Sequence, residues 1–166
     1  MALRSDWSEE LCPVRRGLDV LGDPWVLLII RDVLHGRHRF TDMRANLGIS
    51  DAVLSRRLDE MVEAGLLRRE PYLDGGRSRD EYHATEAGAD LRPILQMLAL
   101  WGEKHTAMPA GGQHMAMMHE RCGQETTTAE LCSACGLPLE PDDMTWVKPW
   151  LGEVHHLVGT GAPTAG

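Results

Sequence analysis

The segment ISDAVLSRRLDEMVEAGLLRRE, residues 49–70, predicts the fold of this chain. Ser50 stands where a helix N-cap accepts a hydrogen bond from a backbone N–H of the first turn. Gly65 favours the left-handed conformation that ends a helix. Between them, apolar residues recur with the 3.6-residue period of an amphipathic helix, at Leu54, Leu58, Met61 and Val62. We therefore expect a capped helix over about Ser50–Ala64 with one buried face.

The opposite face of this helix has small, hydroxyl and charged groups, namely Ala52, Ser55, Arg56 and Asp59, with Arg57 on a flank. Small side chains allow a helix to approach DNA closely, and an arginine fork fits the O6 and N7 atoms of guanine. The alternative for the helix alone is an ordinary surface helix with solvated arginines.

The preceding residues favour DNA binding. The stretch Phe40–Leu47 predicts a short helix, with Thr41 as its cap and Phe40 as the apolar residue before it. Gly48 ends this helix, and Ile49-Ser50 leads into the next one. A short helix, a tight turn with glycine and a second helix form a helix-turn-helix.

The following residues predict a β-hairpin. Leu66–Tyr72 and Glu81–Ala84 have the composition of strands, and Asp74-Gly75-Gly76 is a turn signal between them. Arg77 and Arg79 would lie near the tip of this wing, which spans about Leu73–Asp80. A helix-turn-helix followed by such a hairpin is a winged helix, in which the second helix contacts base edges and the wing contacts backbone or minor groove.

A series of short motifs strengthens this interpretation: Cys12-Pro13, Leu21-Gly22-Asp23-Pro24-Trp25, Leu28-Ile29-Ile30-Arg31, His35-Gly36, Arg39-Phe40, Ile49-Ser50, Leu54-Ser55-Arg56-Arg57-Leu58, Gly65-Leu66-Leu67-Arg68, Glu81-Tyr82, Thr85-Glu86-Ala87-Gly88 and Trp101-Gly102. In order and spacing they resemble HxlR-type winged helix-turn-helix transcriptional regulators over about residues 10–106. The resemblance implies a bacterial, dimeric, DNA-binding regulator. The candidate DNA-binding residues are Arg39, Ser50, Asp51, Ser55, Arg56, Arg57, Arg77 and Arg79.

Cys12 begins the first predicted helix, because Pro13 suits a first helical position. The helix dipole together with Arg15 and Arg16 would lower the pKa of its thiol and make it reactive. The matching cysteine is a thiol sensor in some members of the family that the chain resembles. The alternative is a small residue that is tolerated at a helix start.

Two further helices are expected. Pro24–His35 has a wide apolar face and belongs to the core. Thr85 caps a long helix to His105 that Pro93 bends, with an apolar stripe that one small domain does not need. We expect homodimerisation through the N-terminal helix and the Thr85–His105 helix; the alternative is that the latter packs on its own domain.

The C-terminal part contains paired metal-ligand spacings. His119-x2-Cys122 and Cys132-x2-Cys135 are separated by nine residues, and a glycine follows each pair. Four such donors form a closed tetrahedral site, which is typical of structural rather than catalytic zinc. The arrangement resembles a zinc ribbon with histidine in place of one cysteine. A redox-active dithiol and unpaired surface thiols are the alternatives, and His114 is an alternative nitrogen ligand.

Composition sets the remaining limits. The chain has 166 residues and a formal net charge of −8, but residues 31–79 are locally basic and residues 108–166 are acidic. There is no run of 18 apolar residues and no apolar N-terminal signal segment. We therefore expect a cytoplasmic protein with no membrane partner, whose cysteines are thiols or metal ligands.

The fold class predicted is mainly α with a small β-hairpin wing (α+β). The domains are a winged-helix and dimerisation domain (1–106), a linker (107–118), a zinc-ribbon-like extension (119–150) and a flexible tail (151–166). The function is sequence-specific regulation of transcription at a double-stranded DNA operator; the alternative is a protein-interaction module with a structural zinc. No nucleophile–base pair, phosphate loop or open metal position indicates an enzyme. The inducing signal stays open between a thiol-reactive compound at Cys12, a small-molecule effector and metal availability.

Overall fold

A computed structural model describes residues 6–151 and 153–156, which form two compact units. The first unit comprises Met1–Val33 and Arg37–Gly88, and the second comprises Leu34–Gly36 and Ala89–Gly166. A boundary after residue 106 was expected from the sequence. The structure places it after Gly88, because the helix Arg92–His105 belongs to the second unit. Most of the predicted flexible tail, residues 157–166, lies outside the described residues.

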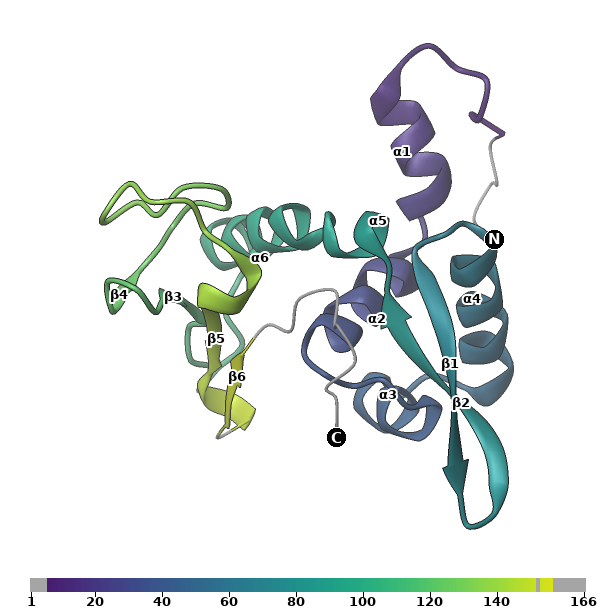
Figure 1. Cartoon of the computed structure of the whole chain (residues 1–166). Coiled ribbons are helices and arrows are strands. Elements are labelled where there is room, and N and C mark those ends of the chain that lie inside the picture. Colours follow the sequence, from purple (N-terminus) through teal and green to yellow (C-terminus); the bar gives the residue numbers. More distant parts are fainter. Residues whose placement is uncertain (1–5, 152, 157–166) are drawn as a thin grey trace. The chain divides into compact units, whose positions relative to one another are not determined.

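Four helices open the first unit (Figure 1), namely α1 (Pro13–Leu21), α2 (Pro24–Leu34), α3 (Phe40–Leu47) and α4 (Asp51–Glu63). The predicted cap of α4 is confirmed, since the Ser50 hydroxyl accepts a hydrogen bond from the Val53 N–H at 3.4 Å. Gly48 ends α3 in the left-handed region with a φ of 63°, a conformation that costs glycine little. The cap predicted for α3 is wrong: Arg39 is the N-cap and Thr41 lies inside the helix.

The wing consists of β1 (Leu67–Asp74) and β2 (Arg77–Ala84), which pair antiparallel with Leu67 opposite Ala84 and Asp74 opposite Arg77. Gly75 and Gly76 form the turn, and both have positive φ. The hairpin is longer than the sequence indicated, because β2 already begins at Arg77. Its distal half is exposed on both faces, so the alternation of apolar and polar residues that marks a half-buried strand is absent there.

The core of the first unit lies between the helices and the base of the wing. Ile29 and Ile30 of α2, together with Met43 of α3, are fully buried. The apolar stripe predicted for α4 is largely buried, with Leu54, Leu58 and Met61 at 2% exposure or less. This burial turns the other face of α4 outward.

The expected helix from Thr85 to His105 is two helices, α5 (Glu86–Ala89) and α6 (Arg92–His105). Thr85 caps the first as predicted, since the Gly88 N–H donates to its hydroxyl at 3.2 Å. Pro93 lies in the first turn of α6. Proline lacks the N–H that would donate to the Ala89 carbonyl in a continuous helix, so the chain breaks its helix between Ala89 and Arg92 instead of only bending it.

The second unit contains a four-stranded antiparallel sheet of order β4-β3-β5-β6 (Figure 1). Its strands are β3 (Ala116–His119), β4 (Gln124–Glu125), β5 (Met144–Lys148) and β6 (Glu153–His156). Two short 3-10 helices, η1 (Pro141–Asp143) and η2 (Pro149–Leu151), flank β5. Among the described residues, no helix has the length and apolar character needed to cross a membrane.

Candidate nucleic-acid interface and metal centre

The outward face of α4 presents two of the predicted DNA-binding side chains without obstruction. Ser55 and Arg56 are exposed. In the described part of the chain, no carboxylate forms an ion pair with Arg56. A guanidinium that is free of internal partners can donate its fork to a base edge at no cost in broken contacts. Ser50, by contrast, already uses its hydroxyl as the helix cap.

Arg57 has a different environment from its neighbour. Its Nη2 atom donates to Oδ2 of Asp23, and its Nη1 atom donates to Oε2 of Glu60 at 2.5 Å. Its side chain is only 16% exposed. The second carboxylate oxygen of Asp23 accepts from the Trp25 N–H at 2.9 Å and so caps α2. One carboxylate therefore joins the start of α2 to the middle of α4.

Two more of the predicted DNA-binding residues are paired within the first unit. Asp51 forms an ion pair with Arg44 across the turn between α3 and α4 at 2.5 Å. Arg39 donates to Oε1 of Glu81 at 2.9 Å and lies 4.5 Å from the centre of the Tyr72 ring. The contact with Arg39 is the main cause of the lowered pKa of Glu81.

The two wing arginines also differ from one another. Arg79 pairs with Asp74 at 3.1 Å across the turn. Arg77 is exposed and forms no ion pair among the described residues. The tip of the wing therefore offers one uncommitted positive charge to a phosphate.

A histidine–carboxylate cluster at the base of the wing was not predicted from the sequence. The rings of His38 and His83 stack with centroids 4.1 Å apart, and Nε2 of His83 lies 3.6 Å from Glu70 and 3.5 Å from Glu81. Nδ1 of His38 lies 3.1 Å from the Tyr82 carbonyl oxygen. Burial lowers the pKa of His38, against the opposing effect of that carbonyl. The alternation of Glu81 and His83 could have indicated that these two side chains share one face of a strand. It could not have indicated His38, because this residue lies in a loop far away in the sequence.

Cys12 lies at the N-cap of α1 as predicted, and its thiol is exposed. The two arginines expected to act on it have other partners. Arg15 pairs with Glu10 at 3.2 Å, and Arg16 donates to the carbonyl oxygens of Glu10 and Leu11 at 2.6 and 2.8 Å. The Cys12 thiol is therefore accessible to a thiol-reactive compound, while the guanidinium groups of Arg15 and Arg16 are bound to other groups.

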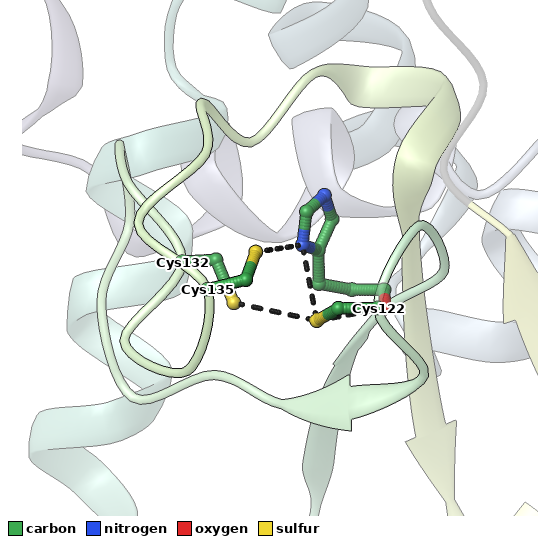
Figure 2. A group of neighbouring side chains, drawn as sticks. Cys122, Cys132 and Cys135 are labelled. Atoms are coloured by element: carbon green, nitrogen blue, oxygen red, sulfur yellow. Dashed lines mark hydrogen bonds between the residues drawn. The ribbon is translucent and has the colours of Figure 1, made fainter.

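The structure brings the four predicted metal ligands together in the second unit. Nδ1 of His119 lies 3.4 Å from the sulfur of Cys122 and 3.4 Å from that of Cys135, and the sulfurs of Cys122 and Cys132 are 3.8 Å apart. Figure 2 shows the three cysteines converging from two separate turns. All four donor atoms lie within 4.8 Å of one another, so this cluster could bind a metal ion.

Local backbone structure explains why the donors converge. His119 ends β3, and the N–H groups of Cys122 and Gly123 both donate to its carbonyl oxygen. On the other side, the Gly136 N–H donates to the Cys132 carbonyl oxygen at 2.9 Å, and Gly136 has a φ of 74°. Each His/Cys or Cys/Cys pair is therefore presented by a tight turn that closes with glycine.

The surroundings of the cluster favour thiolate at one cysteine. Burial raises the pKa of Cys132, but hydrogen bonds from the backbone of Cys135 and Ala134 outweigh it, and the net effect lowers that pKa to about 6. For Cys122, the backbone of Gln124 favours the thiolate, yet burial and the neighbouring sulfurs raise the pKa overall. Negative charge in the cluster therefore lies mainly on Cys132, because a thiolate there disfavours a second thiolate at the neighbouring Cys122.

A capped helix-turn-helix with a two-stranded wing defines a winged-helix regulator of transcription. The family model of HxlR-like helix-turn-helix proteins matches residues 20–109, and the chain belongs to this family. The uncharacterized HTH-type transcriptional regulator Rv3095 of Mycobacterium tuberculosis is 36% identical over 132 residues, which is 80% of this chain and 82% of the relative. The function predicted from the sequence, a transcriptional regulator, is confirmed at this level.

Solved structures similar to the chain include the following two. The crystal structure of PA1607 is 33% identical, covers 84% of this chain and 96% of its own, and has a TM-score of 0.68. The redox regulator HypR in its oxidized form is 32% identical, covers 58% of this chain and 100% of its own, and has a TM-score of 0.53. The predicted fold class, a winged helix with a small β component, is confirmed.

Proposed function

We propose that the chain binds a DNA operator as a homodimer, with α4 in the major groove and the tip of the β1–β2 hairpin on the backbone or in the minor groove. The observation that supports this most directly is the outer face of α4, where Ser55 and Arg56 are exposed and Arg56 has no ion pair with any residue that the structure describes. Arg77 adds phosphate affinity from the wing. Ser50 and Asp51 lie at the start of α4, Arg79 lies on β2 and Arg39 lies at the N-cap of α3, and these residues contribute through the placement of the backbone.

The test is binding of genomic fragments by fluorescence anisotropy, followed by footprinting of the strongest fragment. Arg56→Ala should weaken operator binding by about 1–3 kcal/mol and relax specificity at one base position. Glu63→Ala, on the exposed end of the same helix, is the matched control. An operator affinity that does not change in Arg56→Ala would refute this assignment. A protein-interaction module, the alternative function, would show no sequence-dependent binding at all.

The homodimer is supported by apolar side chains that each unit leaves in solvent. On α1 and just before it, Leu11 is 94% exposed and Val14 67%, and no residue of α1 is buried. On α6, one face has Ile94, Met97, Leu98 and Trp101 exposed by about half. Unpartnered stripes of this kind on two helices are typical of a protein interface. Sedimentation of the purified chain tests this, and Leu98→Glu should shift it toward monomer.

We further propose that the His119/Cys122/Cys132/Cys135 cluster binds one structural zinc ion. A tetrahedral zinc with Zn–S of about 2.3 Å and Zn–N of about 2.0 Å separates its sulfurs by about 3.8 Å and its nitrogen and sulfur by about 3.5 Å. The observed 3.8 Å and 3.4 Å separations agree with this donor set. Bound zinc would neutralise the thiolates and hold together a segment that has little apolar core of its own.

Elemental analysis of the purified chain tests the zinc proposal. We expect about one zinc per chain. Cys132→Ser should abolish it, while Cys12→Ser, which removes a cysteine outside the cluster, should leave it unchanged. Absence of zinc from the unmodified protein, even after incubation with the metal, would refute the proposal.

The exposed thiol of Cys12 supports a thiol-reactive inducing signal, and HypR, a structural relative, is described as a redox regulator. Oxidation or alkylation of Cys12 should then change operator affinity, and Cys12→Ser should abolish the change. A small-molecule effector and metal availability are the other candidate signals.

A further inference from the structure

Helix α6 presents two chemically different faces. One face is turned into the second unit, where Leu95 is 7% exposed and Gln96 is fully buried. The other has the exposed apolar residues Ile94, Met97, Leu98 and Trp101. A fully buried glutamine on a helix otherwise rich in aliphatic residues requires specific partners, because an unpaired buried amide is costly.

Gln96 is hydrogen-bonded to the strand that presents His119, a ligand of the first pair, His119 and Cys122. Its Oε1 atom accepts from Nη1 of Arg92, one turn earlier on α6, at 2.7 Å. Its Nε2 atom donates to the sulfur of Met117 at 3.8 Å. Met117 is 2% exposed and lies on β3, two residues before the ligand His119. The position of Gln96 thus depends on the strand that presents His119.

Arg92 is hydrogen-bonded to the loop that presents the second ligand pair, Cys132 and Cys135. Its Nη2 atom donates to the Leu139 carbonyl oxygen at 2.7 Å. Leu139 is 2% exposed, and its N–H donates to the Glu130 carbonyl oxygen at 2.8 Å. Between these residues the Cys132 N–H donates to the Leu137 carbonyl oxygen at 2.8 Å. The loop that Arg92 contacts is therefore the loop that presents Cys132 and Cys135.

We infer that Arg92 and Gln96 couple metal occupancy of the His119/Cys122/Cys132/Cys135 cluster to the order of α6. The two residues are one helical turn apart and are hydrogen-bonded to each other, and together they contact Met117 and Leu139, which flank the two ligand pairs. This inference rests on the proposed zinc site and extends it, because it gives the metal a consequence outside its own ligands.

The physical basis is the way a small metal-binding segment is stabilised. Without a metal, the two ligand turns lose the contact that keeps them together. The Leu139 carbonyl and the Met117 sulfur then leave their positions, so the half-buried Arg92 loses the acceptor of its Nη2 and the buried Gln96 loses the acceptor of its Nε2, while the hydrogen bond between the two side chains remains. Opening the helix toward water restores hydrogen bonds to both side chains, so α6 loosens. The exposed stripe of α6, which the proposed dimer needs, loses its fixed geometry at the same time.

Hydrogen–deuterium exchange of the full-length chain tests this coupling. The chain is compared loaded with zinc, after removal of the metal with a chelator, and after zinc is restored. We expect amide exchange in residues 92–105 to rise on the order of tenfold on metal removal, while exchange in α4, residues 51–63, changes by about twofold or less. Restored zinc should reverse the effect, and sedimentation should show a parallel loss and recovery of dimer.

Variants distinguish coupling from general destabilisation. Arg92→Met and Gln96→Met remove the hydrogen bonds while retaining much of the side-chain volume. Each should still bind zinc in the same ratio, but the exchange of α6 should no longer depend on the metal. Lys104→Met, at the exposed end of the same helix, should respond like the unmodified chain.

The possible results distinguish a failure of the coupling to α6 from a failure of the proposed zinc site. If zinc does not bind, the proposed metal site fails, and the coupling fails with it. If zinc binds and leaves while the exchange of α6 is unchanged, the metal site stands and the coupling is wrong. A metal response in Arg92→Met and Gln96→Met as large as in the unmodified chain would also overturn it.

Discussion

Arg57 allows a sharp test of how α4, the proposed recognition helix, is held, because its guanidinium can either contact DNA or position this helix. We consider two changes, Asp23→Asn and Arg57→Met. Asparagine keeps an oxygen that can cap α2 through the Trp25 N–H, so the first change removes mainly the charge that Arg57 faces. The second change removes the guanidinium and keeps most of the aliphatic stem.

The magnitude follows from burial. The Arg57 and Asp23 side chains are 16% and 20% exposed, so solvent screens this ion pair only in part. For a charge-assisted hydrogen bond in such an environment we expect a coupling free energy of about 1–2 kcal/mol in a double-mutant cycle. The Arg44–Asp51 pair, at 57% and 67% exposure, is the matched control. Its coupling should be no more than about 0.5 kcal/mol.

The assay is urea denaturation of the two single variants and the double variant, combined with operator binding. If Arg57 positions α4, both single variants should weaken binding to a similar extent, by about fivefold, which corresponds to about 1 kcal/mol. If Arg57 instead contacts a base, Asp23→Asn frees the Nη2 end of its guanidinium, while Nη1 keeps its contact with Glu60, and operator affinity should stay unchanged or rise. That second result, or a coupling free energy near zero, would refute the positioning role.

Two further predictions concern the wing. Arg77→Ala should weaken binding to all DNA sequences about equally and lower the slope of log K against log salt by about 0.9, since one phosphate contact is lost; a loss at a single base position would contradict this. The pKa of His38 is lowered by burial from its ordinary 6.5, so below that pH the unfolded chain binds more protons than the folded one. The free energy of unfolding should therefore be retained above pH 6.5 and fall as the pH drops below it. His38→Asn should reduce this fall in urea titrations at several pH values, and an identical pH profile in the variant would exclude His38 as its source.

The features that were predictable from the sequence are those set by short spacings. Ser50 caps α4, Gly48 ends α3, and the paired ligand spacings around His119 and Cys132 form tight turns, because each depends on neighbours within a few residues. The helix-turn-helix and the wing follow from the same local rules. The convergence of the two ligand pairs was also predictable, since the chemistry of a four-donor site requires it.

The contacts that escaped prediction join distant parts of the chain. The helical period placed Arg57 on a flank of α4 but gave no sign of Asp23, which lies 34 residues earlier. Arg92 contacts the Leu139 carbonyl, and a backbone acceptor leaves no trace in a residue pattern. The stripe predicted along the last helix is divided, because Leu95 packs inward while Ile94 and Leu98 remain exposed. Periodicity identifies apolar faces but not which of them the same chain covers.

The internal pairing of the arginines has a consequence for how this regulator reaches useful affinity. Residues 31–79 are all described, and seven of their ten arginines form ion pairs with carboxylates. Arg37, Arg56 and Arg77 form no such pair with any carboxylate in residues 6–151 and 153–156. The first unit can therefore contact few phosphates without breaking internal pairs, so its binding to DNA of arbitrary sequence should be weak and should change only modestly with salt.

Because one protomer should bind DNA weakly, the joining of two protomers sets the affinity for the operator. When one protomer occupies its half-site, the other binds at a high effective concentration, and the combined affinity can exceed that of either protomer by orders of magnitude. In the proposed dimer, whatever controls the exposed face of α6 would control operator occupancy without altering a single DNA contact. The coupling inferred through Arg92 and Gln96 would act at this step. Metal removal should accordingly weaken operator binding far more than binding to an isolated half-site, and an equal loss on both DNAs would show that the metal acts elsewhere.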